Sequence, residues 1–333
     1  MKWELLELIG IVVLSLAALM FASEKAVKYI LALADHFGFS DTFVGLTVFS
    51  ITTSLPEIIA HLTASMNILA GTLDYKIVSA TVLGANIGSD VIQQTFILGL
   101  VVIVIGGVQF KKDFLITAYL PMIGTTLMCI ILGFDGHYSR LDGCVLFGTF
   151  LAYLIFLYRR EKKAKELLGP PIKSKRVDNV AVDTAIALGC IGIMMVSAHY
   201  LLLSIEKCVE LTGLGASLIG VVTIGVASAS PELFTAFSGI RQKAVGVSLG
   251  TLIGSNIANP LVAIGGGAMI STYWVPRPLI FWDLAMETIT AALLLSYLLL
   301  KKEKGYLGRA GGLYLIGLYL FYLSIRIIYF PVD

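Results

Sequence analysis

Two acidic residues stand out because each lies deep within an apolar run. Glu57 follows Pro56, and Glu232 follows Pro231. A charged carboxylate near the centre of a bilayer costs about 2.5–3.5 kcal/mol on insertion scales, so such a group faces the protein interior and needs a partner. Neither motif contains a Lys or Arg. A bound cation is the partner that these residues favour.

The prolines indicate further ligands close to the two glutamates. Proline has no backbone N–H and disturbs a helix about one turn upstream. We expect it to free the carbonyl oxygens of Thr53 and Ser228, and with them those of Ser50 and Gly225. Free carbonyls at membrane depth are tolerated only where they line a cavity in the protein. Two carboxylates with carbonyl and hydroxyl oxygens suit Ca2+, which takes roughly six to eight oxygen ligands.

A second polar motif occurs downstream in each half of the chain: Gly84-Ala85-Asn86-Ile87 and Gly254-Ser255-Asn256-Ile257. These segments add further candidate ligands, namely Asn86, Ser89, Asp90, Ser255, Asn256 and Asn259. The glycines at 84, 88 and 254 would let helices approach closely. A single motif of this kind could be a packing contact alone, but two motifs beside two Pro-Glu turns favour a binding site.

The composition places all of these motifs in a membrane. The chain has 333 residues, of which 57% are hydrophobic and only 14% charged, and its mean hydropathy is +0.90. A soluble domain of this size needs more charge to cover its surface. A spanning helix needs about 20 apolar residues. We predict about ten spans, at 6–33, 42–68, 76–106, 113–132, 139–158, 178–204, 214–239, 244–271, 278–301 and 307–329.

The loops predict the orientation. Basic residues cluster at 111–112, 159–165, 173–176, 241–243 and 301–309. With ten spans these clusters fall on one side, which the positive-inside rule assigns to the cytoplasm. We therefore expect a multi-pass protein of the cell membrane with both termini outside.

The charged segment at 159–177 divides the spans five and five. We predict a first five-helix repeat at 1–158, a cytoplasmic linker at 159–177 and a second five-helix repeat at 178–333. Because five is odd, the second repeat enters the membrane from the opposite side. Similar motifs in the two halves then indicate an inverted repeat, the architecture of many secondary transporters. The predicted fold class is an all-α membrane protein.

These motifs resemble the alpha repeats of the cation/calcium exchanger superfamily, and the closest likeness is to the short prokaryotic sodium/calcium exchangers. The resemblance covers nearly the whole chain. It implies a central calcium site at Glu57 and Glu232, helped by the backbone oxygens of Thr53 and Ser228, with sodium sites on either side. Ser54 and Ser255 would line one sodium site.

Two departures from that pattern bear on the coupling ion. Ala85 and Ala229 stand where the family commonly has hydroxyl groups, so the second sodium site lacks two side-chain ligands. Two carboxylates in one cavity cannot both ionise cheaply without a cation, so protons can compete with calcium. His61 lies one turn after Glu57 and could relay protons, although a buried histidine with an ordinary hydrogen-bond partner is the favoured interpretation.

Three classes of function remain to be compared. An antiporter of Ca2+ against Na+ fits best, and antiport against H+ through the same glutamates is the alternative. A cation channel is less favoured, because the chain supplies only two acidic turns. No HExxH motif or Ser/Lys dyad indicates an enzyme. The expected partners are inorganic cations and the bilayer, with no nucleic acid and no cofactor. For Glu287, inside the ninth span, we expect an interfacial position or a partner within the bundle.

Overall fold

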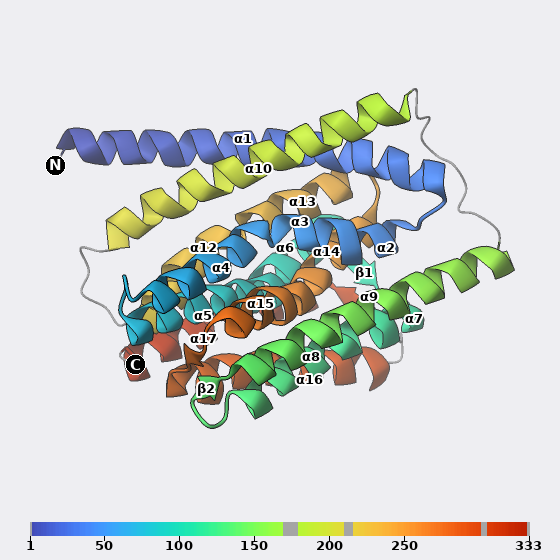
Figure 1. Ribbon diagram of the computed structural model, residues 1–333. Coiled ribbons are helices and arrows are strands. Elements are labelled where there is room, and N and C mark those ends of the chain that lie inside the picture. Colours follow the sequence, from blue (N-terminus) through green and yellow to red (C-terminus); the bar gives the residue numbers. More distant parts are fainter. Residues whose placement is uncertain (1, 169–178, 210–215, 301–304, 332–333) are drawn as a thin grey trace.

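The structure is a computed structural model that describes residues 2–168, 179–209, 216–300 and 305–331 (Figure 1). Apart from two short two-stranded sheets, its elements are helical. Several long helices contain a π-helical turn, labelled η.

The elements of the first half are α1 (Lys2–Phe37), α2 (Asp41–Val44), η1 (Gly45–Phe49), α3 (Ser50–Thr53), α4 (Leu55–Ala70), α5 (Tyr75–Ile92), η2 (Gln93–Ile97), α6 (Leu98–Ile105), β1 (Gly107–Gln109), α7 (Lys112–Phe114), η3 (Leu115–Tyr119), α8 (Leu120–Leu132), β2 (His137–Tyr138) and α9 (Arg140–Leu168). Those of the second half are α10 (Val180–Val209), α11 (Ala216–Ile219), η4 (Gly220–Ile224), α12 (Gly225–Ser228), α13 (Ser230–Arg241), α14 (Val245–Ala258), η5 (Asn259–Ile264), α15 (Gly265–Ile270), β3 (Tyr273–Trp274), η6 (Leu279–Leu284), α16 (Ala285–Leu300), β4 (Tyr306–Gly308) and α17 (Arg309–Tyr329).

The described residues contain nine helices that are long and apolar enough to cross a membrane. A tenth span is formed by two helical pieces, Asp41–Thr53 and Leu55–Ala70, which meet at an angle of 44°. The prediction of an all-helical membrane protein with about ten spans is confirmed. One boundary differs, because α9 continues to Leu168 and so makes the first part of the segment predicted as a linker helical. The domain boundaries themselves stay a prediction.

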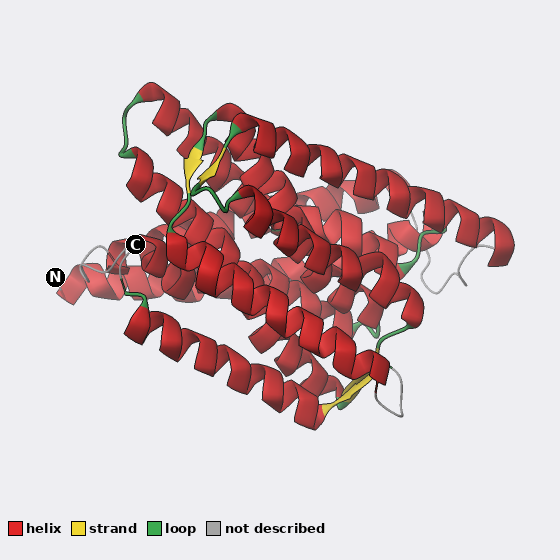
Figure 2. Ribbon diagram, turned by 90° about the horizontal axis from the view of Figure 1, so that it is seen from below, coloured by secondary structure: helices red, strands yellow, loops and turns green. Residues whose placement is uncertain are grey.

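The two small sheets join the halves at opposite ends of the bundle (Figure 2). Strand β1 pairs antiparallel with β4, and β2 pairs antiparallel with β3. β1 follows the third span and β4 precedes the tenth, whereas β2 precedes the fifth span and β3 follows the eighth. Each sheet therefore pairs one connection of the first half with one of the second, as inverted repeats would.

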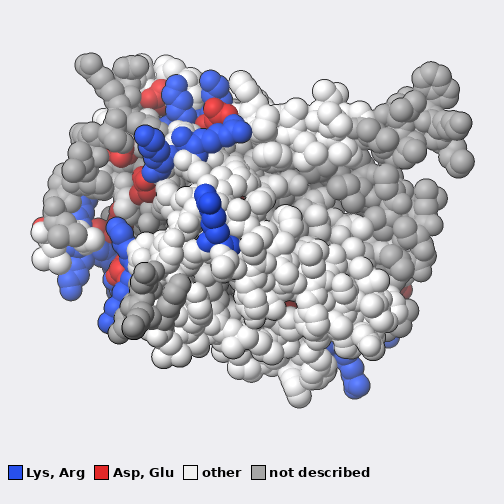
Figure 3. Space-filling view, turned by 180° about the vertical axis from the view of Figure 1, so that it is seen from behind, with Lys and Arg blue, Asp and Glu red and all other residues white. Residues whose placement is uncertain are grey.

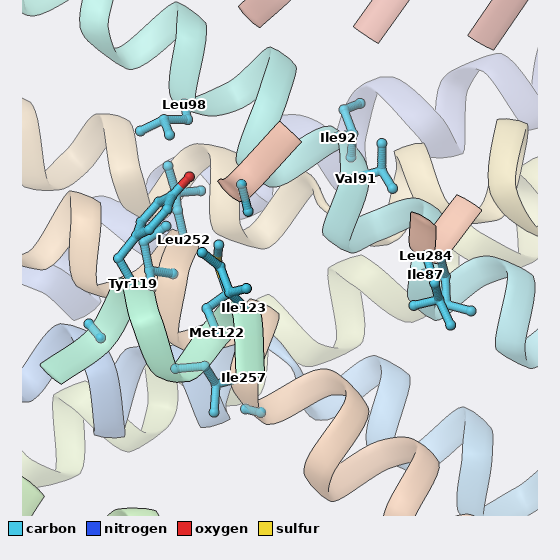
Figure 4. Close-up of a cluster of buried hydrophobic side chains, with 14 of the residues drawn as sticks. Ile87, Val91, Ile92, Leu98, Tyr119, Met122, Ile123, Leu252, Ile257 and Leu284 are labelled. Carbon is cyan, nitrogen blue, oxygen red and sulfur yellow. The ribbon is translucent and has the colours of Figure 1, made fainter. Parts of the chain in front are cut away.

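The bundle has two apolar cores. The larger one combines both halves, and Figure 4 shows part of it, with side chains of α8 beside those of α14 and Ile87 of α5 beside Leu284 of η6. The smaller core lies mainly under α1 and α10, which pack extensively against each other and cross the outside of the bundle (Figure 1). The central helices between these regions hold the Pro-Glu turns.

Close packing of the central helices depends on glycine. A Cβ atom added to Gly84 would lie 2.5 Å from the Ser217 carbonyl oxygen, and one added to Gly88 would lie 2.6 Å from the backbone of Val221. At Gly254 it would lie 2.7 Å from the Cβ atom of Ser50. These distances are too short for real side chains, so the expectation that these three glycines permit close approach is confirmed.

Candidate cation-binding site

A break in the helix precedes Glu57 and Glu232 at the same position in both halves. The helix stops after Thr53 and resumes at Leu55, and in the second half it stops after Ser228 and resumes at Ser230. A π-helical turn lies at the same distance before each break, at η1 and η4. Such turns are frequent at functional sites, because they leave backbone groups outside the regular α-helical pattern.

The carbonyl freed by each proline lies one residue earlier than predicted. The missing N–H of Pro56 would bond to the carbonyl four residues before it, which is that of Thr52. The corresponding residue before Pro231 is Ala227. Thr53 and Ser228 were expected to contribute backbone oxygens to the site. Their side-chain hydroxyl groups also face the glutamates.

Glu57 and Glu232 are buried together in the centre of the bundle. The exposed fraction is 4% for Glu57 and 0% for Glu232, and the two carboxyl groups are close enough to interact electrostatically. Oε2 of Glu57 and both carboxylate oxygens of Glu232 lack a hydrogen-bond partner among the described residues. A buried anion without a partner is costly, so binding of a cation or of protons would stabilise this pair.

Hydroxyl groups from both halves surround the two carboxylates. Ser89 Oγ donates to Glu57 Oε1 at 3.4 Å, and the hydroxyl of Ser228 lies beside the same carboxylate. On the other side, the hydroxyls of Thr53 and Ser255 lie beside Glu232. Their oxygens are 3.2 Å apart and share a hydrogen bond. Each glutamate is thus lined by a residue from the opposite half.

The asparagine motifs meet next to the glutamates. Nδ2 of Asn86 donates to the backbone oxygen of Asn259 at 3.4 Å, and Nδ2 of Asn259 donates to Asp90 Oδ1 at 2.7 Å. Asp90 is close enough to both glutamates for electrostatic interaction. Oδ1 of Asn86 and Oδ1 of Asn259 lack a partner among the described groups. These segments therefore present oxygen atoms that remain free to bind a cation.

Sequence reasoning missed Gln93, which connects the halves. Its Nε2 donates to Ser89 Oγ at 3.0 Å, and its Oε1 accepts from Asn256 Nδ2 at 3.2 Å. Gln93 is fully buried. Its spacing of four residues from Ser89 on the same helix face was the signal that could have identified it.

The remaining predicted ligands occupy different environments. Ser50 accepts a hydrogen bond from Ser255 Oγ through its backbone oxygen, at 3.4 Å. Ser54 is fully buried, and its hydroxyl has no partner in the described part of the chain. Gly225 packs against the backbone of Ala85, with 2.9 Å between an added Cβ atom and the Ala85 carbonyl oxygen. Gly225 therefore brings its helix close to the third span.

The ligand types indicate a hard cation. Within the described residues, no three His, Cys, Asp or Glu side chains form a metal cluster. The site instead offers two central carboxylates with neutral hydroxyl, amide and carbonyl oxygens. Such oxygen ligands suit Ca2+ and other hard cations, whereas Zn2+ and Cu2+ prefer nitrogen or sulfur.

His61 has the ordinary hydrogen-bond partner that was favoured for it. Its Nδ1 lies 3.2 Å from the hydroxyl of Tyr273, which also lies 2.6 Å from Ser65 Oγ and donates to the His61 carbonyl at 2.9 Å. These groups continue along the face of α4 that bears Glu57. Ala236 stands at the matching place after Glu232, so the network belongs to one half only.

Comparison with known proteins identifies the family. A family model described as sodium/calcium exchanger protein matches residues 7–159 and 183–328. An uncharacterised membrane protein of Methanocaldococcus jannaschii is 27% identical over 94% of this chain and 95% of its own length. The sodium/calcium exchanger MaX1 of Methanosarcina acetivorans is 23% identical over 86% of this chain and 90% of its own.

A solved structure gives the same result. The sodium-calcium exchanger NCX_Mj, soaked with Na+ and Ca2+, matches with a TM-score of 0.75 and 25% identity. The match covers 97% of this chain and 98% of that one. These relatives are named as exchangers or membrane proteins rather than enzymes. The chain therefore belongs to the sodium/calcium exchanger protein family, within the cation/calcium exchanger superfamily.

Proposed function

We propose that this protein exchanges Ca2+ for Na+ across the membrane by alternating access, with Glu57 and Glu232 as the central calcium ligands. The observation that supports this most directly is the pair of buried carboxylates, three of whose oxygens lack a partner among the described groups. A Ca2+ ion would neutralise both charges. The hydroxyls of Thr53, Ser89 and Ser228 and the freed carbonyls would complete its oxygen ligands.

Sodium would bind beside calcium, where the two halves differ. Ser54 Oγ is buried and unpartnered among the described groups, and Ser255 lies against Ser50 and Thr53. These neutral oxygens suit a monovalent cation. The competition of Na+ and Ca2+ for the shared glutamates is what couples the two fluxes in this proposal.

The second candidate is H+/Ca2+ antiport through the same glutamates. It is favoured by Ala85 and Ala229, which leave one side of the site without the hydroxyls that the other side has. A site with fewer sodium ligands leaves protons as the ions that can balance the glutamates when calcium departs.

The deciding experiment measures Ca2+ uptake into proteoliposomes under a sodium gradient and, separately, under a proton gradient. Uptake that requires internal Na+ and is insensitive to the imposed pH difference supports the proposal. Uptake driven by the pH difference in sodium-free buffer supports the alternative. Calcium entry that needs neither counter-ion would indicate a channel.

We also propose the orientation with both termini outside. The start of α1 and the end of α17 lie at one end of the bundle (Figure 1). Most Lys and Arg side chains on the face shown in Figure 3 lie toward the other end of the bundle. The positive-inside rule assigns that basic end to the cytoplasm.

A further inference from the structure

A second pair of buried acidic residues lies beside the two central glutamates. Asp90 of α5 and Glu287 of α16 are each 2% exposed. Their carboxyl groups are close enough to interact electrostatically, and both lie near Cys129 of α8. Three spans therefore meet around this second pair, and α16 contributes none of the ligands assigned to the central site.

The buried arginine among the described residues is already paired with another acid. Arg326 of α17 forms a fully buried ion pair with Asp283, with Nε 3.0 Å from Oδ2. Its other nitrogens donate to Ser217 Oγ at 2.7 Å and to the backbone oxygen of Phe330. The ion pairs Arg160–Asp113 and Arg241–Glu24 are exposed. Asp283 thus has a counter-charge, whereas no ion pair within the described ranges provides one for Asp90 or Glu287.

Two buried oxygens in this region have no hydrogen-bond partner among the described residues. Thr126 Oγ1 donates to Glu287 Oε1 at 2.9 Å, but Glu287 Oε2 is unpartnered within the described part of the protein. The amide of Gln94 lies against the same residue, since its Nε2 donates to the Glu287 backbone oxygen at 3.3 Å. Gln94 is 1% exposed, and its Oε1 likewise has no described partner. Buried oxygens are rarely left in this state unless an ion or another donor binds them.

We propose that Asp90, Glu287 and the side-chain oxygen of Gln94 form a second binding site for a monovalent cation, Na+, next to the central calcium site. Oδ1 of Asp90 and Oε1 of Glu287 are engaged by Asn259 and Thr126, so few oxygens remain. This small set suits Na+ better than Ca2+, which needs roughly six to eight oxygen ligands. Asn259 links the two sites, because it bonds to Asp90 and to Asn86.

The role of this site in transport rests on the proposed exchange function, but the binding of Na+ to it can be tested without measuring transport. The test uses the purified full-length chain carrying Glu57→Gln and Glu232→Gln, which removes the central carboxylates. Na+ is titrated against choline at constant ionic strength, and the melting temperature is followed, because a ligand that binds only the folded state raises it. We expect a saturable rise with Na+ in this double variant.

Two further substitutions in the same background identify the site. Glu287→Gln retains the size of the side chain and an oxygen for Thr126, and we expect it to weaken the Na+ response at least tenfold. Gln94→Leu removes the amide oxygen without changing charge and should also weaken the response. The matched control is Glu24→Gln, since Glu24 is exposed and pairs with Arg241 on the surface; it should leave the response unchanged.

The proposal is overturned if the double variant shows no saturable response to Na+. It is also overturned if Glu287→Gln and Gln94→Leu, each monodisperse by gel filtration, respond to Na+ as the double variant does. A carboxyl pair that holds only a proton would give the first of these results. Failure of the exchange function would be seen separately, as absent Ca2+ flux in the wild-type protein.

Discussion

At the scale of single residues, Glu57 and Glu232, the proposed calcium ligands, lie in a place from which water is largely excluded. Replacing either by glutamine retains the shape and removes the charge. We expect Glu57→Gln or Glu232→Gln to reduce calcium uptake into proteoliposomes to the level of empty vesicles, while the protein still elutes as a folded species. Uptake at the wild-type rate in either variant would refute the assignment of the ligands.

The two alanines on the other side of the site predict a gain of sodium dependence. Ala85 corresponds to Ser255, whose hydroxyl bonds to Thr53, and Ala229 corresponds to Ser54. Serine at both positions would supply the missing oxygens, each worth about 1 kcal/mol when well placed. We expect Ala85→Ser with Ala229→Ser to lower the Na+ concentration for half-maximal calcium uptake by roughly thirtyfold. An unchanged sodium dependence would mean that these positions do not line an ion site.

Tyr273 predicts an effect on stability rather than on ion selectivity. Its hydroxyl bonds to Ser65 and to the backbone and ring of His61, and the side chain is fully buried. Tyr273→Phe leaves buried groups unpaired, which costs about 1–3 kcal/mol, so the melting temperature in detergent should fall. Tyr329→Phe is the control, because Tyr329 is exposed; equal melting temperatures for the two variants would contradict the role given to the network.

At the scale of the helices, glycine sets the distance between the third and seventh spans. An alanine Cβ at Gly88 would meet the Val221 backbone at 2.6 Å, and backbone cannot move aside as a side chain can. We expect Gly88→Ala to destabilise the protein by about 1–3 kcal/mol and to reduce transport. Gly124→Ala in α8 is the matched control, since nothing lies within 4 Å of its added Cβ. The comparison is made by thermal unfolding of both variants, and a Gly88→Ala protein as stable as the control would refute the argument.

The sequence identified the helices and the two glutamates because both leave a strong local signal. An apolar run of sufficient length predicts a span, and an acid after proline inside such a run predicts a polar site. Gln93 and Glu287 gave no comparable signal. Their roles depend on partners in other spans, such as Asn256 and Thr126, and a single sequence does not contain that packing. The π-helical turns were missed for the same reason.

At the scale of the whole molecule, the distribution of basic residues predicts which end faces the cytoplasm. Lys163, near the end of α9, and Asp135, between α8 and β2, are both exposed, and they lie toward opposite ends of α9. In a variant without native cysteines, we expect a membrane-impermeant thiol reagent applied to intact cells to label Asp135→Cys but not Lys163→Cys. The reverse pattern would show that the termini lie inside.

The two small sheets have a mechanical meaning. Each sheet pairs a connection of one half of the chain with a connection of the other half. The β1–β4 pair links the two halves at one end of the bundle, and the β2–β3 pair links them at the other. None of the described strands adjoins α1 or α10, which lie across the outside on the smaller core together with residues of the central helices. A rearrangement that moved α1 and α10 over the rest of the bundle would therefore leave both of these strand pairings intact.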